Sequence, residues 1–265
     1  MASFTKITIG QYLPGESFVH RLDPRTKLLI TLFIIVILFL VDTFIGYGLV
    51  ALYIGLFFML SQVPPRFVLR GLRPLVIIIL FTLALNVFLT PGEVLWKWAF
   101  LTVTKEGLIK GAMMGARLIL LIIGTSLLTL TTSPISLTDG IESLLGPGRR
   151  IGIPAHELAM MMTIALRFIP TLLEETEKIM KAQMARGADF ESGNLLRRAR
   201  SLIPLLVPLF VSAFRRADEL ATAMEARCYR GGEGRTKLRQ LRYRSNDYLA
   251  LGVSSVFMVL VAWFF

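Results

Sequence analysis

Long stretches of this chain carry no charged residue, and this feature constrains its fold more than any other. Residues 43–65, 74–92, 118–138 and 248–265 contain no Lys, Arg, Asp or Glu. The hydrocarbon core of a bilayer, about 30 Å thick, is crossed by roughly 20 mostly apolar residues in a helix. Over the whole chain, 54% of the 265 residues are hydrophobic, and a soluble domain of this size rarely contains such long apolar windows. The sequence therefore predicts an integral membrane protein.

The expected fold is all-α, with about five transmembrane helices and a cytoplasmic domain of long amphipathic helices. The predicted spans cover about residues 27–41, 43–63, 74–90, 111–132 and 248–265. The first span is short, and Lys27 at its edge is expected to extend toward the lipid headgroups. Pro24, preceded by Asp23, is typical of a helix start.

Basic residues predict the orientation. The formal net charge is +11, and 18 of the 29 Lys and Arg residues lie between residues 133 and 245. Lys and Arg accumulate on the cytoplasmic side of membranes. We therefore expect three segments: 1–132 with a cytoplasmic N-terminus and four spans, 133–245 as a cytoplasmic domain, and 246–265 as a last span ending outside. A nucleic-acid surface is disfavoured, because the basic stretch 235–244 holds a single aromatic residue, Tyr243.

The segment 133–245 contains two helical stretches with matching ends. One runs from Pro154 to Gly187; the other starts near Leu202, where Pro204 and Pro208 are expected to interrupt it. The first ends in Ala182-Gln183-Met184-Ala185-Arg186-Gly187 and the second in Ala223-Met224-Glu225-Ala226-Arg227-Cys228. Two similar tips suggest two similar receptors. The alternative is two ordinary helix ends, each with an arginine that complements the helix dipole.

Glycines recur every fourth residue near the fourth span, at Gly107, Gly111 and Gly115. Small residues at this spacing share one helix face and allow another backbone to approach closely. They predict a tightly packed helix pair within the membrane.

The chain has few residues of the types that catalyse reactions or bind metals, so no catalytic residue, metal site or cofactor is expected. The chain lacks a phosphate-binding Gly-x4-Gly-Lys-Ser/Thr loop, has one cysteine, and its two histidines are far apart; His20 has no obvious partner. A secondary carrier would need acids or bases within the spans, which hold little more than Asn86 and Arg117.

Several motifs resemble the T components of energy-coupling factor (ECF) transporters, the EcfT/CbiQ-like family. They are the run from Ser17 to Lys27, Thr131 to Pro134, Ala165 to Pro170, and the two Ala-Arg-small tips. The resemblance covers essentially the whole chain in the same order. Cys228 departs from it, because Gly or another small residue is usual at that position.

The resemblance implies a non-catalytic subunit in a prokaryotic cell membrane that binds two ABC ATPase subunits and a substrate-binding membrane S component. It implies that Arg186 and Arg227 anchor the two ATPases, flanked by Ala185, Gly187, Ala226 and Cys228. ATP-driven motion would then drive uptake of a vitamin or metal ion. A T subunit dedicated to cobalt, nickel or biotin stays an alternative, since the substrate, the stoichiometry and the pairing of each arginine with one ATPase are not encoded in these motifs.

Overall fold

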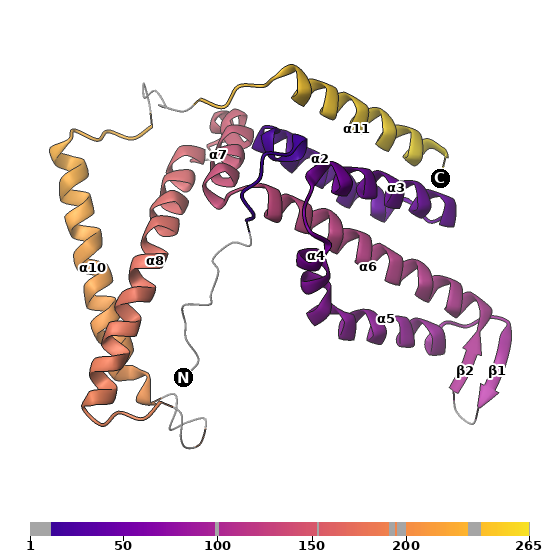
Figure 1. The fold of residues 1–265 in the computed structure, drawn as a ribbon, viewed down its shortest axis with the longest axis horizontal. Coiled ribbons are helices and arrows are strands. Elements are labelled where there is room, and N and C mark those ends of the chain that lie inside the picture. Colours follow the sequence, from indigo (N-terminus) through magenta and orange to yellow (C-terminus); the bar gives the residue numbers. More distant parts are fainter. Residues whose placement is uncertain are drawn as a thin grey trace. The chain divides into compact units, whose positions relative to one another are not determined.

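The computed structural model of this chain describes residues 12–98, 101–152, 154–190, 194, 200–232 and 240–264. Its elements, in chain order (Figure 1), are α1 (Phe18–Arg21), α2 (Pro24–Leu40), α3 (Phe44–Ser61), α4 (Pro65–Leu72), η2 (Arg73–Leu75), α5 (Val76–Leu89), β1 (Val94–Trp98), β2 (Leu101–Thr104), α6 (Lys105–Thr131), α7 (Pro134–Leu145), η3 (Gly146–Ile151), α8 (Ala155–Ala185), α10 (Ile203–Ala226) and α11 (Ser245–Phe264). They form two compact units: residues 10–144 with 240–265, called the membrane unit, and residues 145–239, called the tip unit.

Five helical segments among the described residues are long and apolar enough to cross a membrane, which confirms the membrane-protein fold class. They are Phe44–Ser61, Pro65–Leu89, Lys105–Thr131, Ala155–Ala185 and Ser245–Phe264. This set differs from the predicted one at two helices. The set lacks α2, which at 17 residues is slightly shorter than each of these helices, and it includes α8, whose mean hydropathy of 1.2 is the lowest among them. The short turn at residues 41–43 joins α2 to α3, so we expect these two helices to cross the membrane as a pair.

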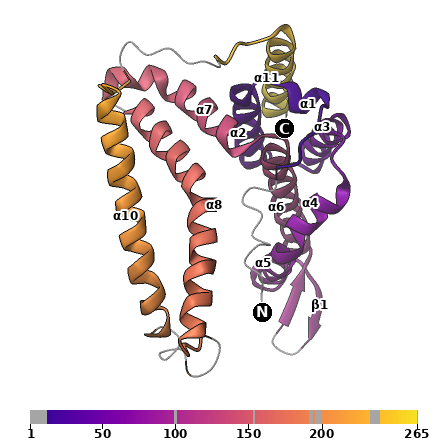
Figure 2. The same cartoon turned by 60° about the vertical axis from the view of Figure 1, so that its left-hand side comes forward.

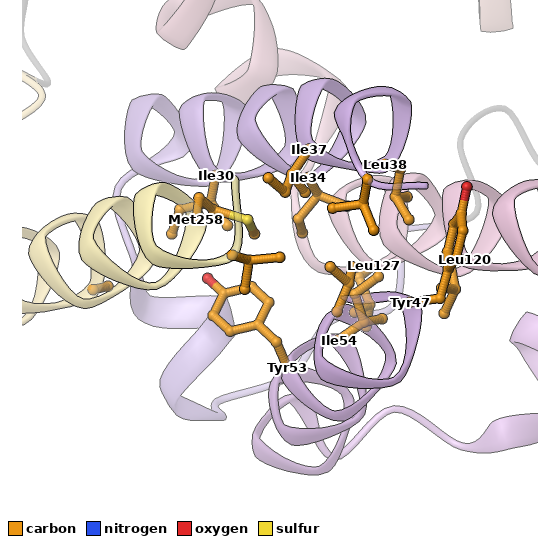
Figure 3. Close-up of a cluster of buried hydrophobic side chains, with 14 of the residues drawn as sticks. Ile30, Ile34, Ile37, Leu38, Tyr47, Tyr53, Ile54, Leu120, Leu127 and Met258 are labelled. Carbon is orange, nitrogen blue, oxygen red and sulfur yellow. The ribbon is translucent and has the colours of Figure 1, made fainter. Parts of the chain in front are cut away.

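The core of the membrane unit is an apolar cluster contributed by α2, α3, α6 and α11. Figure 3 shows Ile34, Ile54 and Leu127 in this cluster, together with Met258. Inside it, the Tyr53 hydroxyl donates to Ser254 Oγ at 2.6 Å, and Ser254 is completely buried. Ser254 Oγ in turn donates to the Ala250 carbonyl, so both hydroxyls have partners and can remain among apolar side chains at little cost.

The start of α2 is fixed by hydrogen bonds that the sequence predicted only in part. Asp23 caps the helix as expected, accepting from the Arg25 backbone N–H at 2.9 Å. The expectation for Lys27 was wrong: its side chain is buried, and Nζ donates to the His20 carbonyl at 3.1 Å and the Thr131 carbonyl at 2.9 Å. These carbonyls end α1 and α6, and such orphan carbonyls favour a cation.

His20, for which the sequence indicated no obvious partner, has two partners within seven residues of it along the chain. Its Nδ1 lies 2.6 Å from Ser17 Oγ, and its Nε2 lies 3.0 Å from the Leu13 carbonyl oxygen. Burial lowers the pKa of His20 below its ordinary value; the bond to Leu13 opposes this, and the Lys27 charge adds to it. The neutral ring, with its proton on Nε2, satisfies both contacts.

Several elements were absent from the sequence-based prediction, and three of them pack within the membrane unit. The first is α4, whose buried Val68 packs with Val63 and Leu130. The second is a hairpin in which β1 and β2 pair antiparallel. The third is α7, where Gly140 lies so close to α2 that an added Cβ would be 3.1 Å from Pro24 Cβ. Each is too short to give a span-length hydropathy signal.

The tip unit contains two long helices, α8 and α10, which pack along each other in opposite directions (Figures 1 and 2). The expected interruption at the α10 prolines was wrong, because α10 is continuous from Ile203 to Ala226. Pro204 lies in the first turn, where a helix N–H has no partner in any case. Pro208 cannot donate to the Pro204 carbonyl; Gln183 Nε2 from α8 donates to it instead, at 3.3 Å.

Candidate functional site: two arginine tips

The first tip is the end of α8, and its backbone follows a complete Schellman motif. Gly187 has φ +87°, the left-handed conformation that glycine adopts without a Cβ penalty. Its N–H donates to the Met184 carbonyl at 3.0 Å, and the Ala188 N–H donates to the Gln183 carbonyl at 3.0 Å. Arg186 is therefore held at the C-cap of α8, immediately before the chain turns away.

The second tip, at the end of α10, has the same geometry at the equivalent positions. The Cys228 N–H donates to the Glu225 carbonyl at 2.8 Å, and the Tyr229 N–H donates to the Met224 carbonyl at 3.0 Å. Cys228 has φ 56° and takes the place of Gly187. A left-handed residue other than glycine costs roughly 1–2 kcal/mol, so the tip retains this turn against a local penalty.

All six predicted tip residues are exposed in the described part of the chain. They are Ala185, Arg186, Gly187, Ala226, Arg227 and Cys228. Within the described residues, neither Arg186 nor Arg227 forms an ion pair or a side-chain hydrogen bond, and Cys228 is a free thiol. Two arginines with five N–H donors each are thus available to carbonyl or carboxylate groups of another molecule.

The two tips lie at opposite ends of the helix pair. Gln183, next to the first tip, bonds to Pro204 at the start of α10, whereas Arg227 follows the end of α10. The 24 residues of α10 span about 36 Å at 1.5 Å per residue. The same turn therefore recurs at the two opposite ends of this antiparallel helix pair.

Polar contacts at mid-length connect α8 to α10. Glu175 accepts from Ser212 Oγ at 2.5 Å and from Arg216 Nη2 at 2.9 Å. Together with the Gln183–Pro204 bond, this fixes the helices in one register. The sequence shows the acids and bases but gives no signal for which residue on the other helix each one meets.

The predicted glycines of α6 lie at different separations from α5. A Cβ at Gly107 would lie 2.7 Å from the Asn86 carbonyl oxygen, and one at Gly111 would lie 3.4 Å from the Leu83 carbonyl oxygen. At Gly115 the nearest atom, Ile79 Cγ2, is 4.0 Å away. Close backbone approach is therefore concentrated at Gly107, near the start of α6.

The two polar residues noted within the spans are occupied by local contacts. Arg117 Nε donates to the Tyr47 hydroxyl at 2.8 Å, and its Nη2 lies 3.2 Å from Asp42 Oδ1. Asn86 Nδ2 donates to the Thr82 carbonyl at 2.9 Å. No group of three or more His, Cys, Asp or Glu that could hold a metal occurs within the described segments.

Comparison with known proteins gives one consistent result over almost the full length. The family model described as cobalt transport protein, CbiQ, matches residues 15–238. The chain is 64% identical to the energy-coupling factor transporter transmembrane protein EcfT of Thermosediminibacter oceani, covering 95% of this chain and 96% of that protein. It is 52% identical to the protein of the same name from Bacillus subtilis, covering 90% of this chain and 91% of that one.

Proposed function

Because this chain belongs to the family of energy-coupling factor transporter transmembrane proteins, we propose that it couples ATP hydrolysis on partner subunits to substrate uptake. In this role it binds two ABC ATPase subunits through its tips and a substrate-binding S component in the membrane. It carries out no chemistry itself. It resides in a prokaryotic cell membrane, with its N-terminus and residues 133–245 in the cytoplasm.

One observation supports this proposal most strongly: the repeated Schellman tips at opposite ends of the α8–α10 pair. Each presents an exposed arginine flanked by small residues, so a groove on a partner can close around the helix end. Two related ATPases arranged about a two-fold axis would receive two such tips equivalently. Schellman turns and exposed side chains are common at helix ends, so it is the repeated Ala-x-x-Ala-Arg-small sequence around both arginines that favours a shared role.

In this proposal the S component, and not this chain, selects the substrate. A subunit dedicated to cobalt, nickel or biotin is the second candidate, and it is favoured only by the name of the matching family, cobalt transport protein. Purification of the complex and identification of the S component by mass spectrometry distinguishes a shared from a dedicated subunit.

The experiment that tests the ATPase contact is truncation of both tip arginines. Loss of one buried, charged anchor costs about 2–4 kcal/mol, on the order of 30- to 1,000-fold in affinity. We expect Arg186→Ala with Arg227→Ala to lose the ATPase subunits on purification and to abolish uptake. Each single variant should weaken binding of one ATPase.

Arg215→Ala is the matched control, because Arg215 is an exposed arginine on α10 away from either tip. It should co-purify with both ATPases like the unmodified chain. Normal assembly and transport by the double tip variant would refute the anchoring proposal.

A further inference from the structure

Two chain connections join the tip unit to the membrane unit, one after Leu144 and one before Gln240. If the tips receive the motion of the ATPases, as proposed above, these two connections are the covalent routes by which motion leaves the tip unit. Residues that hold both connections in place are therefore candidates for transmitting it.

Arg25, in the first turn of α2, contacts both connections within the membrane unit. Its Nη1 donates to Ser143 Oγ at 3.1 Å, in the last turn of α7. Its guanidinium carbon lies 4.0 Å from the ring centroid of Tyr243, which follows Gln240. A guanidinium over an aromatic ring gains electrostatic attraction in addition to contact.

Arg25 is itself rigidly held. Its Nε and Nη2 each donate to one carboxylate oxygen of Asp23, both at 3.0 Å. The side chain of Asp23 is 3% exposed and that of Arg25 is 13% exposed. A bidentate pair of this kind fixes the plane of the guanidinium, and a lysine cannot reproduce it.

A second carboxylate secures the connection that precedes α11. Asp247 is almost completely buried, at 1% exposure. Its Oδ1 accepts from the Asp23 backbone N–H and its Oδ2 from the Arg244 backbone N–H, both at 2.7 Å. The residues next to Tyr243 are thus bonded to the same helix start that carries Arg25.

We propose that Arg25 is a positioning residue that clamps both connections of the tip unit to the start of α2. Arg25 contacts one connection at Ser143 and the other at Tyr243. Asp23 fixes the Arg25 guanidinium, and Asp247 bonds the residue after Tyr243 to the start of α2. Motion of the tip unit then reaches the membrane helices at this junction instead of being absorbed in loose connections. The inference depends on the proposed function, because it assumes that the tips are driven by ATPases.

The test is the amount of substrate taken up per ATP hydrolysed, measured on assembled complexes in proteoliposomes. Ser143→Ala with Tyr243→Leu removes both contacts and leaves the Arg25–Asp23 pair in place. Arg25→Lys keeps the charge but loses the fork and the stacking geometry. In both variants we expect ATPase subunits to co-purify, hydrolysis to persist, and uptake per ATP to fall about tenfold, as lost cation–π and charged hydrogen bonds permit.

Arg21→Lys is the matched control. Arg21 pairs with Glu16 at 3.1 Å, but the two side chains are 65% and 91% exposed, so uptake per ATP should not change. If uptake per ATP is unchanged both in Ser143→Ala with Tyr243→Leu and in Arg25→Lys, the inference is overturned. This holds even if these variants reduce the yield of the complex. Failure of the unmodified chain to bind ATPases would instead refute the proposed function.

Discussion

At the scale of single residues, backbone conformation explains the one departure from the family pattern at the tips. Cys228 has the left-handed φ of 56° that Gly187 has at the equivalent position, with φ +87°. The Schellman hydrogen bonds of the second tip form nevertheless. A small side chain at this position is therefore compatible with the turn, and the identity of the flanking residue matters less than its conformation and exposure.

The glycines of α6 give a prediction that depends on one added methyl group. In Gly107→Ala, the new Cβ would lie 2.6 Å from Thr104 Oγ1, 2.7 Å from the Asn86 carbonyl and 2.9 Å from the Val87 carbonyl. Two of these atoms belong to the α5 backbone and cannot move away cheaply. We expect a loss of about 1–3 kcal/mol in stability, from overpacking, and a lower midpoint of thermal unfolding in detergent.

The control for Gly107 is the same substitution two turns along the helix. At Gly115 the nearest atom to a new Cβ is 4.0 Å away, and alanine favours a helix over glycine by about 1 kcal/mol. Gly115→Ala should unfold at the same temperature as the unmodified chain or higher. Equal losses at both positions would mean that close approach of α5 is not what requires glycine at Gly107.

At the scale of helices, Glu175 is expected to control the register of α8 against α10. Glu175→Ala removes the bonds to both Ser212 and Arg216, and the pair is partly exposed, so we expect a loss of about 1–2 kcal/mol. Spin labels at Lys178 and Arg215, in a Cys228→Ser background, should report a broader distance distribution. Glu174→Ala, which changes the exposed neighbouring acid, should leave the distribution as narrow as before.

The sequence predicts the elements that are specified by a pattern within one continuous segment, and it does not predict those that depend on contacts between segments. The three spans from 43–63, 111–132 and 248–265 were predicted close to α3, α6 and α11, because long apolar runs specify them. The tips were predicted as helix ends because their turn is coded within six residues. The Gln183–Pro204 bond, which supplies a donor to the carbonyl that Pro208 cannot reach, joins two helices, and no pattern along the chain indicates it.

At the scale of the whole molecule, α8 is long and apolar enough to cross a membrane, so a measurement of the membrane topology decides whether it can contact a cytoplasmic partner. Positive-inside asymmetry predicts that Asp42, with an 86% exposed side chain, and the C-terminus lie outside, and that Arg186 lies in the cytoplasm. Accessibility reporters at these three positions measure on which side of the membrane each one lies. An outside reading at Arg186 would mean that α8 crosses the membrane, as its length and mean hydropathy of 1.2 allow, and would exclude it as a cytoplasmic contact.

The assembled transporter provides a final test through the only thiol in the chain. Cys228 is exposed and adjacent to Arg227, so maleimide should label it readily in the isolated subunit. If an ATPase covers the second tip, labelling in the complex should be far slower. Gly187→Cys in a Cys228→Ser background reports the first tip. Because Cys228 already occupies the equivalent left-handed position, a cysteine at Gly187 should also be accommodated.

The comparison of the two thiols separates occlusion by ATPases from burial within the subunit. Both positions are exposed in the isolated chain, so protection that appears only in the complex must come from a partner. Because the proposal places one ATPase at each tip, both thiols should be protected, and removal of the ATPases should restore the labelling of both. Rapid labelling of both thiols in the complex would place the tips in solvent, and the repeat would then be only two helices that end alike.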